Sequence, residues 1–400
     1  MTAARPPTLS AGRKIFLIAT EESGDRLGAG LMKVLRQRLG DAVQFEGVGG
    51  RAMAREGLTS LFPIEELSIL GLAAVVRQLP KILRLIRDTA AAVTDAPTDI
   101  LVIIDSPDFT HRVARRVRAT LPRLPVVNYG SPTVWAWRPG RAKAMRGYVD
   151  CVLALLPFEP AAHERLGGPR CVYVGHPLIE RLDELRPNTE EAARRAASPP
   201  RIVVLPGSRR AETARLMEDF GAALTLVSRN VGAIEAVLPT LPHVEAEVRA
   251  RAVAWSVRPR IVVGEAEKLA AFRGARAALA KSGTGTLELA LAGVPMVAAY
   301  KLARRDAFWF KYFVKVSVST ILLPNLILGE RAIPELLQHD CTPAALAGAL
   351  APLMGDGPER RTQLAALTRL DEVMRFDDGK APSAHAAAAV LETIAARTQS

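Results

Sequence analysis

The sequence predicts an α/β protein with two Rossmann-like, doubly wound domains facing a cleft. Short apolar segments alternate with helical segments along most of the 400 residues, which is the pattern of parallel strands joined by crossover helices. One stretch breaks the alternation: residues 186–200, RPNTEEAARRAASPP, are rich in charged and small side chains. Because a chain of this length can bury two cores, we expect one domain on each side of this break.

The first half is expected to contain a parallel sheet with helices on both faces. Each expected strand is a short apolar run that ends at glycine, proline or acidic residues. The clearest is TDILVII at 98–104, which is nearly all apolar, as a strand buried on both faces should be. The strands expected in this half are 14–19, 44–50, 98–104, 124–129 and 151–157.

The second half repeats this pattern from residue 201 onward, and the stretch after 360 is expected to be helical. The strands expected in this half are 201–205, 234–238, 260–263, 276–281 and 295–299. We therefore expect an N-terminal domain at 1–185, a linker at 186–200, a C-terminal domain at 201–365, and a helical segment at 366–400 that packs back on the N-terminal domain.

Composition narrows the class of partner. Lys and Arg together exceed Asp and Glu by 12, and the pI is near 10, so anionic partners such as nucleic acid, acidic phospholipid or phosphorylated substrates are favoured. The alternative is a generally basic background, because many of these charges lie on amphipathic helices. Three cysteines without a metal-like spacing are typical of reduced thiols in a cytosolic protein.

Membrane and export signals are expected to be lacking. The first apolar run, 15–19, is too short for the core of a signal peptide. We see no segment of roughly 20 uninterrupted apolar residues, the length that a spanning helix needs. A soluble, cytosolic protein is expected, with contact at a membrane surface left open.

Asp105 is the first candidate for chemistry, because it follows the central strand directly. In open α/β sheets, ligands bind beyond the carboxyl ends of the strands. A carboxylate at that position can act as a general base on an attacking hydroxyl. The alternative is that Asp105 caps the next helix, although Asp108 is the better capping candidate.

A second acidic group, EESGD at 21–25, ends the first strand. Its three carboxylates argue against phosphate binding and suit recognition of sugar hydroxyls instead. The alternative is a cluster that caps the following helix. The residues of this group expected to bind an acceptor are Glu21, Ser23, Gly24 and Asp25.

Two strand ends in the second half suit an anion. In PGSR, Gly207 permits a tight turn, Ser208 can cap a helix, and Arg209 can grip phosphate with two hydrogen bonds. In SGTGTLE at 282–288, a glycine turn precedes a helix expected to begin near 286, with Glu288 in its first turn. Together the two turns suit a nucleotide diphosphate, although neither has the spacing of a Walker loop or a GxGxxG motif.

Residues 72–87 form a basic amphipathic segment that can rest on an anionic bilayer. The alternative is an ordinary helix that faces the core with a solvated basic side. The residues expected to contact membrane or acyl chains are Val75, Val76, Leu79, Ile82 and Leu83.

Taken together, the ordered motifs resemble those of bacterial lipid-A-disaccharide synthases from about residue 15 to 390. The stretches that carry the resemblance are EESGD, IDSPDF (104–109), SPTVWAWR (131–138), LPFE (156–159), GHP (175–177), LPGSR (205–209), SGTGTLE (282–288) and LPNL (323–326). The resemblance implies an inverting glycosyltransferase of the two-Rossmann GT-B type. Such an enzyme joins UDP-2,3-diacylglucosamine to 2,3-diacylglucosamine 1-phosphate through a β-1,6 bond and releases UDP.

The resemblance also implies roles for individual residues. It makes Asp105 the catalytic base, and the nucleotide contacts that it implies are Arg209, Ser282, Gly283, Thr284, Glu288 and Asn325, which join Gly207 and Ser208. We see no Asp-x-Asp metal pair near the nucleotide site, so neither a metal nor a cofactor is expected. The expected location is the inner face of the cytoplasmic membrane, with a homodimer left open.

Two other functions are compatible with parts of this pattern. A UDP-sugar epimerase shares the architecture but needs no acceptor lipid. A basic nucleic-acid-binding protein would show binding to arbitrary DNA or RNA that falls steeply with salt, yet we recognise no nucleic-acid-binding motif, so no nucleic-acid partner is expected.

Overall fold

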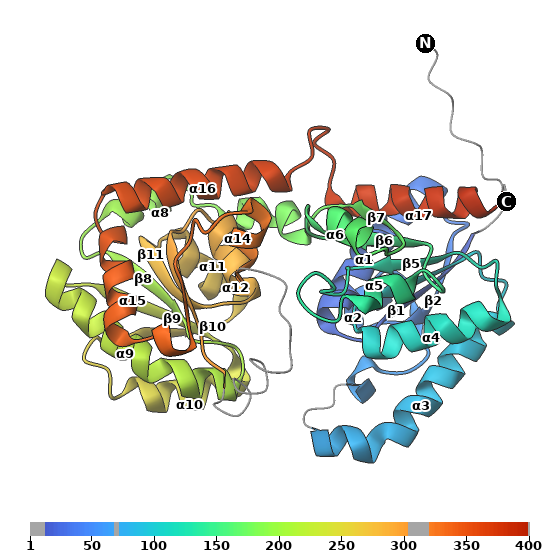
Figure 1. Ribbon diagram of the computed structural model, residues 1–400, viewed down its shortest axis with the longest axis horizontal. Helices are drawn as coiled ribbons and strands as arrows, with labels where there is room; N and C mark the ends of the chain where they lie inside the picture. The colour runs from blue at the N-terminus through green and yellow to red at the C-terminus, as the bar shows by residue number, and fades with distance from the viewer. Residues whose placement is uncertain (1–12, 68–71, 303–319, 399–400) are drawn as a thin grey trace, which may run out of the picture. The chain divides into compact units, whose positions relative to one another are not determined.

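The structure is a computed structural model that describes residues 13–67, 72–302 and 320–398, except for the side chains of 72–77 and 398. It divides into two compact units (Figure 1). The first unit contains Met1–Pro177 together with Phe376–Ser400, and the second contains Leu178–Arg375. Each unit is built around one parallel β-sheet.

The first unit contains a seven-stranded sheet in the order β3-β2-β1-β4-β5-β6-β7, with every neighbouring pair parallel. Side chains alternate between its two faces, as the period of a strand requires: Ile15 and Leu17 belong to one hydrophobic core, Phe16 and Ile18 to the other. The strands are β1 (Lys14–Ala19), β2 (Gln44–Val48), β3 (Thr59–Ser60), β4 (Ile100–Ile104), β5 (Val126–Tyr129), β6 (Cys151–Ala154) and β7 (Arg170–Tyr173).

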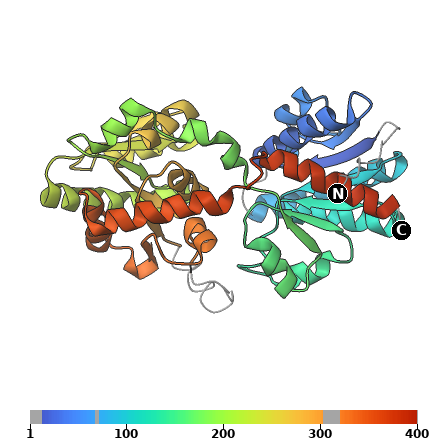
Figure 2. The ribbon, with the colours of Figure 1, turned by 90° about the horizontal axis from the view of Figure 1, so that it is seen from above.

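Helices cover both faces of this sheet. The last helix of the chain is one of them: Ala386, Val390 and Ile394 are buried in the same core as α1, and α17 lies beside α1 (Figure 2). The helices of the first unit are α1 (Glu22–Leu39), α2 (Arg51–Arg55), α3 (Leu72–Asp95), α4 (Pro107–Thr120), α5 (Gly140–Met145), α6 (Glu159–Arg165) and α17 (Pro382–Thr398), with a 3-10 turn at Ile64–Leu67.

The second unit contains a six-stranded parallel sheet in the order β10-β9-β8-β11-β12-β13. Its strands are β8 (Arg201–Leu205), β9 (Glu235–Thr240), β10 (Arg260–Val263), β11 (Ala277–Lys281), β12 (Met296–Tyr300) and β13 (Glu335–Leu337). Its helices are α7 (Leu182–Leu185), α8 (Thr189–Ala196), α9 (Arg210–Val231), α10 (Pro242–Ala252), α11 (Glu265–Arg273), α12 (Thr284–Leu291), α14 (Leu323–Leu328), α15 (Pro343–Leu350) and α16 (Pro358–Met374), with 3-10 turns at Pro177–Arg181, Gln338–Asp340 and Ala351–Leu353.

The prediction of two doubly wound α/β domains is confirmed. The expected break at 186–200 contains the short helix α8. Asn188 and Glu191 cap the N-terminus of this helix with a reciprocal capping box. Within the expected C-terminal segment 366–400, α16 lies in the second unit and α17 in the first.

Strand order locates the crevices where ligands bind in this fold. In the first sheet the direction of winding reverses between β1 and β4, and in the second between β8 and β11. Doubly wound proteins bind ligands at the carboxyl ends of the strands, at the point of reversal. EESGD and Asp105 lie just beyond the carboxyl ends of β1 and β4, and PGSR and SGTG lie just beyond those of β8 and β11.

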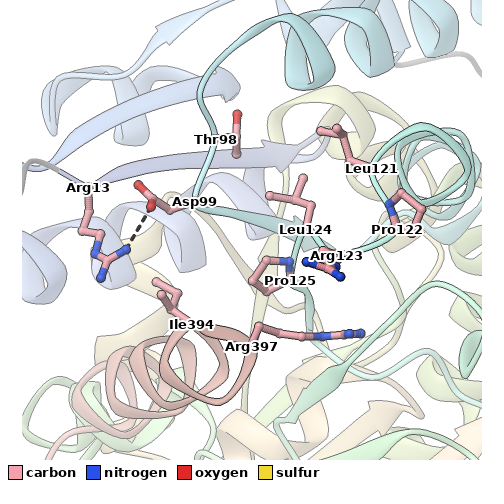
Figure 3. A pocket seen from close by; sticks show the side chains of 10 residues that line it. All are labelled: Arg13, Thr98, Asp99, Leu121, Pro122, Arg123, Leu124, Pro125, Ile394 and Arg397. Carbon is pink, nitrogen blue, oxygen red and sulfur yellow. Dashed lines mark hydrogen bonds and ion pairs between the residues drawn. The ribbon is translucent and has the colours of Figure 1, made fainter. Parts of the chain in front are cut away.

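A cavity of about 600 Å³ lies at the opposite edge of the first sheet. Arg13, Asp99 and Pro125, which immediately precede β1, β4 and β5, help to line it, and Arg13 pairs with Asp99 at 2.9 Å (Figure 3). Because ligands of this fold bind at the carboxyl ends of strands, this cavity at the amino ends is a poor candidate for the substrate site.

Among the described residues, no helix is long and apolar enough to cross a bilayer.

Candidate active site

A cavity of about 620 Å³ lies at the carboxyl ends of β8, β9, β10 and β11 in the second unit. It brings together most of the residues expected to bind a nucleotide. Those among its lining are Gly207, Ser208, Arg209, Gly283, Thr284 and Glu288. Other lining residues are Glu212, Thr240, Gly264, Glu265, Lys268, Phe272, Lys281 and Gly285.

The conformation of the turn after β8 is stabilised by the carboxylate of Glu212. Gly207 has φ +131°, and a Cβ there would lie 2.5 Å from the Cβ of Glu212, so only glycine fits this turn. The backbone N–H groups of Ser208 and Arg209 donate to Glu212 Oε2 at 3.0 and 3.3 Å. Lys281 Nζ lies 3.1 Å from Glu212 Oε1. These donors, which suit a phosphate, are engaged by Glu212 within the chain.

Among the cationic side chains that line this cavity, Arg209 is the most available to a ligand. Its side chain is exposed, and none of the ion pairs found among the described residues includes it. Lys268 and Lys281 are instead paired with glutamates that line the same cavity. A planar guanidinium can hold a diphosphate with two parallel hydrogen bonds.

The helix after SGTG begins earlier than the sequence predicts. α12 starts at Thr284, with Gly283 as its N-cap residue, so the prediction of a start near residue 286 is wrong. Glu288 therefore lies in the second turn and not in the first. The reason is local: Thr286 Oγ1 and its backbone N–H both donate to Gly283 O, at 2.6 and 3.0 Å, which draws Thr284 and Gly285 into the helix. The open end of α12 favours an anion.

Glu288 is positioned by a lysine of the neighbouring helix. Lys268 Nζ donates to both carboxylate oxygens, at 3.0 and 3.2 Å, and also lies 2.9 Å from Glu265 Oε2. The Glu288 side chain keeps 15% of its surface exposed. A carboxylate fixed in this way retains lone pairs for sugar hydroxyls.

Two expected nucleotide contacts lie outside this cavity. Ser282 is 5% exposed, and its Oγ donates to Ile321 O at 3.5 Å. Asn325 is 1% exposed, and its amide both donates to Ile333 O at 2.9 Å and accepts from Ile333 N at 3.0 Å. Both side chains are thus placed to shape the loops of the second unit.

Asp105 stands at the end of β4 in an unusual backbone conformation. Its φ is +51°, and that of Ser106 is +44°, so two consecutive residues without glycine's freedom lie in the left-handed region. Such conformations cluster at functional sites, where the surrounding structure holds them. Thr110 Oγ1 donates to Asp105 O at 2.6 Å, and Asp105 N donates to Tyr129 O at 3.2 Å. The strained turn leaves the Asp105 side chain exposed.

The loop after β1 reaches this turn. Ser106 Oγ donates to Glu21 Oε1 at 2.9 Å, and both side chains lie at the surface. Ser23 is also exposed, whereas Gly24 is buried, with the position of a Cβ 3.4 Å from Ala19 and Ile104. The first unit therefore gathers two carboxylates and two hydroxyls at the reversal of its sheet.

Asp25 has a different environment from its neighbours. It is 3% exposed, and its carboxylate accepts three backbone N–H groups at the start of α2, from Gly50 at 2.7 Å, Ala52 at 2.8 Å and Met53 at 3.0 Å. The side chain links α1 to α2 and satisfies the open end of α2. This geometry gives Asp25 a structural function.

We expect Asp25→Asn to lower the free energy of unfolding by about 2 kcal/mol, because one charged acceptor of buried N–H groups is lost. Urea unfolding followed by circular dichroism measures the change. Glu22→Gln, an exposed neighbour on the same helix, is the control and should shift stability by less than about 0.5 kcal/mol. Unchanged stability with weaker acceptor binding would instead assign Asp25 to the binding site.

The two tryptophans after β5 have separate environments. Trp135 is 8% exposed and donates to Glu159 at 3.2 Å, and burial raises the pKa of Glu159 to about 7. Trp137 is 42% exposed, with the Arg138 guanidinium 4.1 Å from its ring centre. Trp135 thus belongs to the core, and the Trp137–Arg138 pair is available to a ligand.

The helix α3 contains the expected membrane contacts. Leu79 and Leu83, one turn apart, are 43% and 40% exposed, while Ile82 packs partly against the core. The side chains of Val75 and Val76 lie outside the described residues. Two large apolar side chains on one exposed stripe are suited to an apolar partner.

Comparison with known proteins identifies the family. Residues 15–389 match the model of the lipid-A-disaccharide synthetase family. The chain is also 63% identical over 382 residues to the lipid-A-disaccharide synthase of Bradyrhizobium diazoefficiens, a match that covers 96% of this chain and 97% of the relative. The chain belongs to the lipid-A-disaccharide synthase family.

The chain shares its fold with solved structures of the GT-B type. The chain is similar to the UDP-GlcNAc 2-epimerase of Neisseria meningitidis (TM-score 0.57, 12% identity, covering 96% of this chain and 99% of the other). It is equally similar to MurG of Acinetobacter baumannii (TM-score 0.57, 15% identity, covering 95% and 99%). At these identities the likeness concerns the fold alone, and the two-Rossmann GT-B architecture expected from the sequence is confirmed.

The sequence did not predict several lining residues of the second unit's cavity in this member of the lipid-A-disaccharide synthase family. Thr240 is the last residue of β9 and Gly264 directly follows β10, so the rule that ligands bind at strand ends could have found them. Glu212 and Lys268 lie inside helices. Nothing in their spacing distinguishes them from ordinary surface residues, because their partners come from other elements.

Proposed function

We propose that the chain transfers 2,3-diacylglucosamine from its UDP derivative to the 6-hydroxyl of 2,3-diacylglucosamine 1-phosphate. The products are a β-1,6-linked disaccharide 1-phosphate and UDP, in the biosynthesis of lipid A. The enzyme is a glycosyltransferase, as its family membership establishes. The observation that carries the residue assignments is the placement of Asp105 and of the nucleotide cavity at the two points of sheet reversal.

In this proposal the second unit binds the donor. Arg209 and the open end of α12 face the diphosphate, and Glu288 accepts hydrogen bonds from ribose hydroxyls. When the bond between the anomeric carbon and the diphosphate oxygen breaks, negative charge grows on the leaving UDP. Fixed positive charge and N–H dipoles stabilise that charge without reorganisation, so Arg209 takes the place that a metal ion has in other transferases.

The first unit binds the acceptor and supplies the base. The Asp105 carboxylate removes the proton from the acceptor 6-hydroxyl as its oxygen attacks the anomeric carbon. Attack on the face opposite to UDP inverts the α-linked donor to a β-linkage. Glu21, the N-cap residue of α1, and Ser23, in the first turn of that helix, are proposed to bind acceptor hydroxyls.

Both substrates carry acyl chains, and α3 is proposed to contact them or the inner face of the cytoplasmic membrane. Leu79 and Leu83 supply the exposed apolar stripe. Lys81, Arg84 and Arg87 lie on the same helix and are exposed, which suits anionic headgroups. Peripheral attachment of this kind needs no spanning helix.

The Lys268–Glu288 pair provides a test of the donor site. Glu288→Gln and Lys268→Met should each weaken UDP binding by about tenfold, because the lysine holds the carboxylate in place. Titration calorimetry with UDP should show no further loss in the double variant. Glu267→Gln, an exposed change on the same helix, is the control. Losses that add in the double variant would contradict the shared role.

A UDP-sugar epimerase is the rival function, since a structure with that activity shares the fold. The two functions differ in their need for an acceptor. UDP release from UDP-diacylglucosamine should require diacylglucosamine 1-phosphate if the chain is a transferase. Conversion of the UDP-sugar alone to an epimer would support the rival.

A further inference from the structure

A second, smaller cavity of about 140 Å³ lies against α4 in the first unit. Pro107, Asp108, His111, Arg112 and Arg115 line it from α4. These positions recur at intervals of three or four residues, so they share one side of the helix. Arg141, in the first turns of α5, closes the other side.

The charge of this cavity is strongly positive. Three arginines line it, against the single carboxylate of Asp108. Arg141 Nη2 lies 3.6 Å from Asp108 Oδ1, too far for a direct hydrogen bond, and the Asp108 side chain is 88% exposed. Arg112 is exposed, and none of the ion pairs found among the described residues includes it. The arginines therefore have donors to offer an anion.

A buried hydrogen-bond chain fixes one of these arginines. Asn128 Nδ2 donates to Gly130 O at 2.8 Å, so its Oδ1 must accept from His111 Nε2 at 2.9 Å. His111 Nδ1 then accepts from the Tyr148 hydroxyl at 3.0 Å. The Tyr148 oxygen in turn accepts from Arg115 Nη2 at 3.3 Å. Every member has one consistent direction of donation.

This chain needs a neutral histidine. Burial lowers the pKa of His111 to about 4, so the ring is uncharged at neutral pH and can accept from Tyr148. The Arg115 guanidinium also lies 4.7 Å from the centre of the Tyr148 ring. Arg115 is thus an exposed cation whose guanidinium is fixed by Tyr148. Because the side chain is already ordered, it loses less conformational entropy when it binds an anion.

The cavity adjoins the proposed catalytic base. Pro107 and Asp108 follow Asp105 by two and three positions. Since Asp105 lies two residues before the start of α4, the base and the cavity lie at the same end of this helix. A sugar whose hydroxyl reaches Asp105 would extend its opposite end toward the arginines.

We propose that this cavity binds the phosphate monoester of the acceptor sugar, with Arg112, Arg115 and Arg141 as its ligands. The inference rests on the proposed function, because that function supplies an acceptor with a phosphate at the anomeric carbon. Guanidinium groups bind phosphate with two parallel hydrogen bonds each. The site would select the phosphorylated acceptor over the same sugar without phosphate.

The test compares two short-chain acceptors, diacylglucosamine with and without the 1-phosphate, in titration calorimetry with the full chain and no phospholipid. The wild type should bind the phosphorylated acceptor at least about tenfold more tightly. Arg112→Gln and Arg141→Gln should each reduce that preference severalfold and leave UDP affinity unchanged. Arg116→Gln, an exposed change on the same helix outside the cavity, should keep the full preference.

Other outcomes would overturn the assignment. One such outcome is that the wild type binds the two acceptors equally, and another is that Arg112→Gln and Arg141→Gln keep the full preference. Either result would show that the acceptor phosphate does not bind in this cavity. If both variants bind vesicles of anionic phospholipid more weakly but keep the acceptor preference, the arginines serve a lipid headgroup instead. Turnover of the wild type tests the proposed function separately, because the binding measurement does not depend on disaccharide formation.

Discussion

Asp105→Asn is expected to lower kcat by roughly 100-fold or more while UDP affinity stays unchanged. The carboxylate is the proposed acceptor of the proton from the attacking hydroxyl, and an amide cannot accept it. Asparagine is the right replacement because, like aspartate, it tolerates the left-handed conformation found here at φ +51°. Initial rates at saturating substrates, with calorimetry for UDP, measure the two quantities.

The control for this experiment is Asp41→Asn. Asp41 is exposed and precedes β2, so it lies at the amino ends of the strands, away from the proposed site. Its rate should match the wild type. An Asp105→Asn enzyme with a near-normal kcat would refute the assignment of the base, and equal losses in both variants would indicate damage to the first unit as a whole.

Arg209→Gln is expected to lower kcat/KM for the UDP-sugar by roughly 100-fold, equivalent to about 2.7 kcal/mol of transition-state stabilisation. The other cations of the cavity, Lys268 and Lys281, already neutralise glutamates. Arg209 is therefore the side chain left to balance the charge that grows on the leaving UDP. Steady-state rates over a range of donor concentrations give the value.

Arg210→Gln removes a charge one residue further along as a matched control. Arg210 is exposed at the start of α9 and does not line the cavity, so its kcat/KM should remain within about threefold of wild type. If the two substitutions lower kcat/KM equally, the effect comes from the general positive potential and not from a contact with the diphosphate.

The central strands could be predicted from the sequence, because strands buried on two faces are short, nearly continuous apolar runs. The strands missed are β3, β7 and β13, each at the edge of a sheet. Edge strands here are short or mixed in polarity, as TS, RCVY and ELL show. With one neighbour and less burial, they leave little pattern to read.

The candidate site was predictable where a residue directly follows a strand, and less so elsewhere. Asp105 directly follows β4, and Arg209 lies in the short loop between β8 and α9. Asp25 lies in the same acidic group as Glu21, yet it caps a helix whose N–H groups come from residues 50–53. Glu288 depends on Lys268, 20 residues away. Such partners are set by tertiary packing, which local patterns do not contain.

The most direct test of the account is the structure of the product. The purified chain should convert UDP-2,3-diacylglucosamine and 2,3-diacylglucosamine 1-phosphate in detergent into UDP and one disaccharide in equal amounts. Mass spectrometry and NMR coupling constants should identify a β-linkage to carbon 6 that retains the 1-phosphate. An α-linkage, or loss of the UDP-sugar without a disaccharide, would contradict inverting transfer by this enzyme.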